Sequence, residues 1–174
     1  MRWWSASRLL PALMLVGLAV APAAAVDPAE LMRPCRRQDL IGAWRVMRVN
    51  VPRGSSVDRD DPAFLPHQRY VFRANATMTY ATQEVPFTAE EQRALVTAPP
   101  VATWAMEAEG RLVRQRDGVP AVERTECRVL TKAVKDSGTT HLTAQAGDLL
   151  LTEQSVDGRP ATRRLLRRIR GLGE

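Results

Sequence analysis

The sequence predicts an all-β protein, a single antiparallel up-and-down β-barrel of eight or nine strands with one or two short helices. Short segments of alternating apolar and polar residues recur along most of the chain. Several of them are joined by glycine turns, namely Glu109-Gly110, Asp117-Gly118 and Asp157-Gly158. Because an open run of strands exposes two edges to unwanted pairing, a sheet closed into a barrel is the favoured arrangement.

Residues 1–25 predict an export signal. Arg2 and Arg8 provide a positive start, residues 9–20 are apolar, and Ala23-Ala24-Ala25 forms a small-residue cleavage site. The apolar run is shorter than the roughly 18–20 residues of a membrane span. We therefore expect cleavage, no stable membrane anchor and a periplasmic location. Cys35 lies too far from the cleavage point for a lipoprotein. After cleavage, residues 26–174 are expected to form the barrel domain.

The first part of the mature chain predicts a helix, a strand and a long loop. Asp27-Pro28-Ala29-Glu30 has the pattern of a helix start, and the helix should end before Pro34. Residues 41–50 predict the first strand, with Trp44 and Val46 on one face. Residues 51–68 form a polar loop with three prolines, a length typical of lids and binding elements.

The remaining elements follow as hairpins around one helix. Residues 69–73 and 77–81 alternate cleanly on both sides of a short turn. Thr88-Ala89-Glu90-Glu91 is a capping box that opens a helix over residues 89–97, which Pro99-Pro100 ends. Further strands are expected at 101–108, 111–116, 119–131, 139–146, 149–155 and 159–169. The basic run 163–170 also fits an amphipathic helix, but the preceding Asp157-Gly158 turn favours a closing strand.

Charge and cysteine content limit the function classes. The chain carries a formal charge of +6, yet its arginines are scattered rather than clustered with aromatic residues, so nucleic-acid binding is not expected. Cys35 and Cys127 are the two cysteines, and an even number in an oxidising compartment favours a disulfide over two buried free thiols. No C-x-x-C motif for redox chemistry or haem attachment occurs.

Gly42-x-Trp44 in the first strand, the segment "YVFRANATMTY" and the final "LLLTEQSVDGRPATRRLLRR" strand pair resemble the lipocalin (calycin) group, in particular small exported bacterial proteins with a lipocalin-like domain. The resemblance implies that Trp44 lies at the closed end of the barrel, with Arg167 or Arg168 of the last strand stacked on it in a structural role. The helix at 89–97 and the position of Cys35 depart from the usual lipocalin pattern.

A barrel of eight strands either holds one small ligand or is filled by its own side chains, and the sequence leaves both arrangements open. In the first arrangement an apolar cup with tyrosine hydroxyls as polar groups lies beneath the long loop. Phe64 and Leu65 would then contact the ligand from that loop. The candidate cup residues share strand parity: Tyr70, Phe72, Met78, Tyr80, Trp104 and Met106.

Catalytic and metal motifs are not evident in the sequence. No G-x-S-x-G occurs, His67 and His141 have no metal-type ligands at the usual spacing, and the acidic segment 58–61 lacks the glycine and glutamate of a calcium loop. We therefore expect no enzyme activity, no cofactor and no metal. The predicted function is binding or carriage of a small apolar or amphipathic molecule. The alternative is an accessory or inhibitor module that binds an exported partner protein through its loops.

Overall fold

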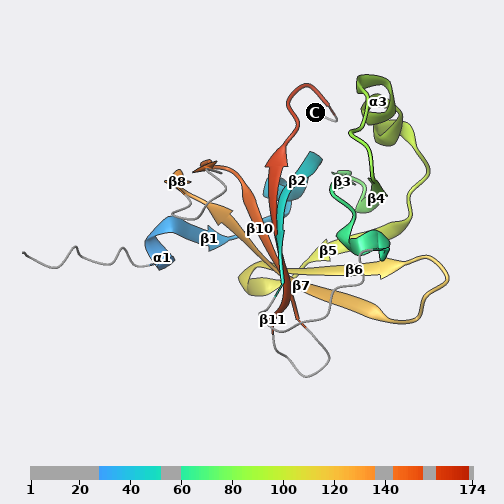
Figure 1. Ribbon diagram of the computed structural model, residues 1–174. Helices are drawn as coiled ribbons and strands as arrows, with labels where there is room; N and C mark the ends of the chain where they lie inside the picture. The colour runs from blue at the N-terminus through green and yellow to red at the C-terminus, as the bar shows by residue number, and fades with distance from the viewer. Residues whose placement is uncertain (1–27, 52–59, 136–142, 155–159, 173–174) are drawn as a thin grey trace, which may run out of the picture.

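The computed structural model describes residues 28–51, 60–135, 143–154 and 160–172, so the predicted leader lies outside the described residues. Its centre is a closed antiparallel barrel of eight strands, which confirms the predicted fold class (Figure 1). Neighbouring barrel strands are consecutive along the chain except where β8 and β9 intervene. The barrel strands are β2 (Gly42–Asn50), β3 (His67–Phe72), β4 (Thr77–Gln83), β5 (Ala102–Met106), β6 (Arg111–Arg116), β7 (Val122–Leu130), β10 (Leu149–Gln154) and β11 (Pro160–Arg168).

Two pairings close the barrel. The last strand, β11, pairs with the first, β2, and places Arg168 directly opposite Trp44. Strand β7 divides one of its edges between two partners: its first half pairs with β6, and residues 128–130 pair with a short strand, β1 (Met32–Pro34). This extra strand is a correction to the predicted N-terminal helix, because only α1 (Pro28–Leu31) is helical and the chain then extends along β7.

Short helices connect the strands. The predicted capping box is present in α3 (Ala89–Thr97), where the Thr88 hydroxyl accepts from the Glu91 backbone N–H at 3.2 Å. The sequence did not predict α2 (Arg37–Leu40), nor the single turns η1 (Pro62–Phe64) and η2 (Ala108–Gly110). No helix among the described residues has the length and apolar character needed to cross a membrane.

The first half of the strand expected at 139–146, residues 139–142, lies outside the described residues. In the described half only β9 (Thr143–Ala144) is a strand, and it pairs with β8 (Val134–Lys135) in a separate small hairpin and not in the barrel. The sequence pattern was misleading here because a short alternating segment fits an accessory hairpin as well as a barrel strand. The long loop is also shorter than predicted at its end, since β3 begins at His67.

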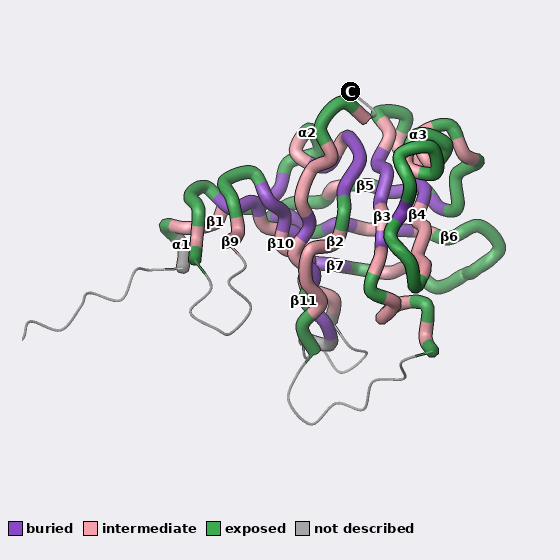
Figure 2. The backbone as a smooth tube through the Cα atoms, turned by 45° about the horizontal axis from the view of Figure 1, so that its top comes forward, coloured by how far each residue is buried: buried purple, intermediate pink, exposed green. Residues whose placement is uncertain are grey.

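Buried residues are concentrated on the barrel strands, whereas helix α3 and most turns are exposed or half-buried (Figure 2). Trp44, Phe72 and Leu112 are almost completely buried, and Leu40 of α2 enters the same core. The Phe72 and Trp104 rings meet edge to face with centroids 5.5 Å apart. This end of the interior is therefore filled by side chains.

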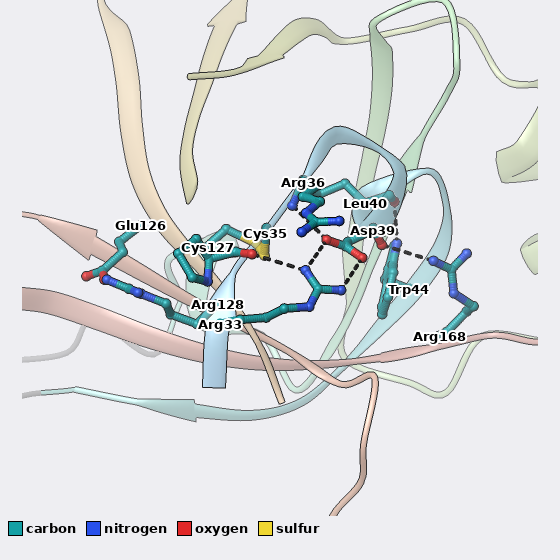
Figure 3. The surroundings of a disulfide bond; sticks show 11 residues. Arg33, Cys35, Arg36, Asp39, Leu40, Trp44, Glu126, Cys127, Arg128 and Arg168 are labelled. Carbon is teal, nitrogen blue, oxygen red and sulfur yellow. Dashed lines mark hydrogen bonds and ion pairs between the residues drawn. A yellow bond between two sulfur atoms is a disulfide. The ribbon is translucent and has the colours of Figure 1, made fainter. Parts of the chain in front are cut away.

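The predicted disulfide between Cys35 and Cys127 is present and both cysteines are buried. It ties the segment between β1 and α2 to the centre of β7, and the backbone N–H of Cys35 donates to the carbonyl of Cys127 at 3.0 Å. Figure 3 shows Asp39 beside this bridge, between Arg33 and the backbone of Arg36. The bridge thus holds in place the chain segment that leads into β2 and Trp44.

Candidate functional site

The inward-facing residues change from apolar to polar at one level of the barrel. Along β6, Leu112 is followed two residues later by Arg114, and along β11, Leu166 is preceded by Arg164. Because adjacent strands are antiparallel, these changes bring the polar residues into one layer. We call this set the interior polar cluster: Gln68, Tyr70, Tyr80, Arg114, Glu123, Thr125, Glu153, Thr162 and Arg164.

Glu153 is the centre of the interior polar cluster. Its carboxylate lies 2.5 Å from Nη1 of Arg164 and 3.3 Å from Nη2 of Arg114, and it accepts from the Thr162 hydroxyl. Burial by itself raises the pKa of Glu153, but the charge of Arg164 and the hydrogen bonds from Thr162 and Arg164 outweigh it, so the pKa is held below the usual value. Glu153 is therefore an ionised carboxylate at neutral pH.

Arg114 is the least satisfied member of the cluster. Its Nη2 contacts Glu123 at 3.2 Å and the Thr125 hydroxyl at 3.2 Å. Only 9% of the Arg114 side chain is exposed, and its Nε is buried without a hydrogen-bond partner. A buried donor without an acceptor is unusual in a folded protein, because the lost hydration of the N–H is not replaced. An acceptor supplied from outside the chain would satisfy it.

The tyrosines and Gln68 complete the cluster. The Tyr70 and Tyr80 ring centroids lie 4.7 Å apart, and the Tyr80 hydroxyl donates to Oε1 of Gln68 at 3.2 Å. Burial is the main cause that raises the pKa of both tyrosines, so both hydroxyls are neutral. They offer hydrogen bonds without adding charge.

Two cluster members also hold the turn η1 against the barrel. The amide of Gln68 donates to the carbonyls of Ala63 and Leu65, both at 2.9 Å, and Nη2 of Arg164 donates to Ala63 at 3.0 Å. Phe64, within this turn, and Leu65, directly after it, are half-buried. The described end of the predicted binding loop is thus connected directly to the interior polar cluster.

The predicted cup residues divide between two environments. Tyr70 belongs to the interior polar cluster as well as to the core, and Tyr80 is half-buried beside it. Phe72, Met78 and Trp104 are buried in the apolar core, and Met106 packs on its edge. The two tyrosines of the predicted cup thus lie at the polar layer, and its other residues lie in or against the apolar core.

The start of β2 and the end of β11 bring together the tryptophan and arginine that the resemblance pairs. The guanidinium carbon of Arg168 lies 4.4 Å from the centroid of the Trp44 ring, and the indole N–H donates to the Leu40 carbonyl at 2.7 Å (Figure 3). Arg167 faces the other side of the strand and contacts Asp148 at 2.7 Å. Arg168 is thus the stacked residue of the two candidates.

Sequence reasoning missed most of the interior polar cluster. The sequence analysis assigns no site role to Arg114, Arg164 or Glu153, because charged residues are usually solvated. Their parity was the available signal, since each lies two residues from a buried leucine of the same strand. The structure also places Glu123 beside Arg114.

Metal-type ligands and a surface groove are the remaining candidate features of the described residues. No three His, Cys, Asp or Glu side chains gather there as a metal site requires. His67 is half-buried in β3, His141 lies outside the described residues, and Asp61 caps η1 by accepting from the Ala63 N–H at 2.8 Å. A shallow groove of about 480 Å³ lies on the outer surface beside the disulfide, between Arg36, Arg37 and Met106.

In comparisons with known proteins, no family model matched the chain, and neither a curated protein nor a solved structure was found to match it.

Proposed function

We propose that this chain is an exported, non-catalytic, lipocalin-like barrel that binds a small amphipathic molecule, with the polar end of the ligand at the interior polar cluster. The unpartnered Nε of Arg114 is the observation that carries the proposal. A carboxylate, phosphate or carbonyl oxygen of a ligand would accept from it. The tyrosine hydroxyls beside it are suited to a second polar group of the same molecule.

The energetics of the cluster support a binding role over a purely structural one. Arg164 is 3% exposed and Arg114 is 9% exposed, while their partner Glu153 is 28% exposed. Replacing buried ion pairs with apolar residues of similar size is often neutral or stabilising. A barrel selected only for stability would therefore be expected to continue its apolar core through this layer.

The disulfide and the N-terminal sequence support export. A disulfide that joins Cys35 to Cys127 persists in an oxidising compartment, and the basic, apolar and small-residue segments before residue 26 have the order of a cleaved leader. The periplasm combines these two requirements.

Mass spectrometry of the exported protein tests the proposal. The full chain is expressed with its own leader, purified, and measured under native and denaturing conditions. We expect a noncovalent mass on the native protein that is lost on denaturation, and we expect Arg114→Met to reduce its occupancy. Arg111→Met is the matched control, because Arg111 is on the same strand with 57% of its side chain exposed. A bare wild-type protein, or equal occupancy in Arg114→Met and Arg111→Met, would contradict the proposal.

The filled apolar core favours a second candidate, an accessory or inhibitor module that binds an exported partner protein. Trp44, Phe72 and Leu112 occupy the interior of the closed end, whereas the groove beside the disulfide is open to a partner. Arg36→Glu reverses a charge at that groove. Under this candidate Arg36→Glu abolishes capture of the partner from a periplasmic extract, and Arg114→Met leaves capture unchanged.

A further inference from the structure

Three arginines lie side by side on the outer face of the barrel. Arg167 of β11 is directly opposite Arg45 of β2, and Arg45 is directly opposite Arg69 of β3. Like charges at directly opposite positions repel each other. Asp148 neutralises Arg167 at 2.7 Å, but within the described ranges Arg45 and Arg69 have no carboxylate partner. Two adjacent positive charges are therefore left uncompensated on this face.

Arg69 is held in place with part of its donor capacity unused. Its guanidinium carbon lies 4.8 Å from the centroid of the Phe87 ring, and its Nη1 donates to the Gln68 carbonyl at 3.0 Å. Its Nε is buried without a hydrogen-bond partner. Burial, together with the nearby charge of Arg45, lowers the pKa of Arg69. The surroundings therefore destabilise the positive charge on the Arg69 guanidinium.

A second unused donor is located on the same face. Gln83 pairs with His67, and Arg69 pairs with Ala81, so Gln83 lies diagonally across the β3–β4 ladder from Arg69. Diagonal neighbours on one face of a sheet are within reach of long side chains. The Nε2 of Gln83 is also buried and has no acceptor at hydrogen-bond distance, and its amide lies close to the Glu91 carboxylate, whose pKa it helps to lower. Two buried donors and an exposed arginine are thus grouped on one surface of β2, β3 and β4.

We infer that Arg45, Arg69 and Gln83 form a binding site for a phosphate group on the outer face of the barrel, separate from the interior polar cluster. The planar guanidinium donates in pairs to phosphate oxygens, and such charge-assisted hydrogen bonds are stronger than neutral ones. A phosphate dianion balances both uncompensated arginine charges, whereas a carboxylate would balance one. The group belongs either to a free phosphate compound, which can supply the dianion, or to a phosphatidylglycerol head group, whose phosphodiester is a monoanion, and both present unesterified phosphoryl oxygens to the arginine donors.

The test follows the arginine side chains of the full mature protein by NMR. Inorganic phosphate is titrated against chloride at equal ionic strength while the Nε–H resonances are recorded. The variants are Arg45→Gln, which alters an exposed side chain, and Arg111→Gln, an exposed control with the same change in charge. We expect a saturable shift of the Arg69 Nε–H and roughly tenfold weaker binding in Arg45→Gln, because one charge-assisted donor is lost. Arg111→Gln should bind as the wild type does.

Vesicles identify the source of the phosphate. Phosphatidylglycerol vesicles that sediment with the wild type and the Arg111→Gln variant, but not with Arg45→Gln, would support the site with a lipid head group as its ligand. Binding of inorganic phosphate without vesicle binding would support the site with a free phosphate compound. The inference is overturned if neither probe binds saturably, if the Arg69 Nε–H does not shift, or if Arg45→Gln and Arg111→Gln bind equally.

Discussion

Gly42 makes room for the arginine that closes the barrel, and substitution of this glycine tests that relation. Arg168 donates from Nη1 to the Ile41 carbonyl at 2.6 Å and from Nη2 to the Asp39 carbonyl at 2.9 Å, with its guanidinium over Trp44. A Cβ at position 42 would overlap Nη1 of Arg168. The backbone φ angle of Gly42 is +130°, a conformation that residues other than glycine rarely adopt. Gly42→Ala should therefore strain the backbone and displace the guanidinium.

The contacts give the size of the effect. Two hydrogen bonds from a charged donor contribute about 1.5 kcal/mol each, and the stack on Trp44 contributes about 1 kcal/mol, so Arg168→Ala should cost about 4 kcal/mol of unfolding free energy. Strain from an alanine at position 42 costs about 2 kcal/mol. Because Gly42→Ala also loses most of the Arg168 contacts, we expect it to cost about 5 kcal/mol, but only about 2 kcal/mol in the Arg168→Ala background.

Equilibrium urea unfolding at neutral pH, followed by tryptophan fluorescence with the disulfide intact, measures all four proteins of this cycle. We expect a coupling energy of about 3 kcal/mol. If the double variant does not fold, Arg168→Lys replaces Arg168→Ala, because lysine keeps the charge without the paired donors. Arg170→Ala, at an exposed position, is the control and should change stability by less than about 0.5 kcal/mol. Additive losses from Gly42→Ala and Arg168→Ala would refute the reasoning.

Three further predictions concern the disulfide, the buried carboxylate and a helix cap. Replacing Cys35 and Cys127 by alanine opens a loop with a sequence separation of 92, so urea unfolding should show a loss of up to about 4–5 kcal/mol, and a loss under about 1 kcal/mol would contradict this. Glu153→Gln leaves Arg164 buried without its carboxylate and should cost roughly 3 kcal/mol at neutral pH. The pKa of Glu153 is lowered in the folded state, so its contribution to stability is present above the usual value of 4.5 and is lost as the pH falls through the folded pKa. A difference in unfolding free energy between wild type and Glu153→Gln that stays constant in acid would contradict this. Thr88→Ala should destabilise α3 by about 1 kcal/mol, visible as faster amide exchange in that helix but not in the barrel.

The interior polar cluster shows how far local sequence signals extend. Alternation identified the strands that carry it, and β6 begins and ends where the sequence predicts. The charges of Arg114 and Arg164, however, argued for solvent exposure, since ionised side chains are seldom buried. Their actual environment depends on Glu153, which reaches them from a third strand. The contact of Glu153 with Arg114 joins residues 39 positions apart, so it leaves no pattern in either local segment.

The sequence by itself determined the elements whose cause is local. The hairpin over residues 69–81, the capped helix α3 and the alternation that makes one face of each strand apolar all depend on neighbours within a few residues. The tertiary structure alone decided which arginine of the last strand stacks on Trp44, that residues 32–34 add a strand to β7, and that the barrel interior has a charged layer. These features depend on register between distant strands, and register is set by closure of the whole sheet, because a shift by one residue would turn every inward side chain outward.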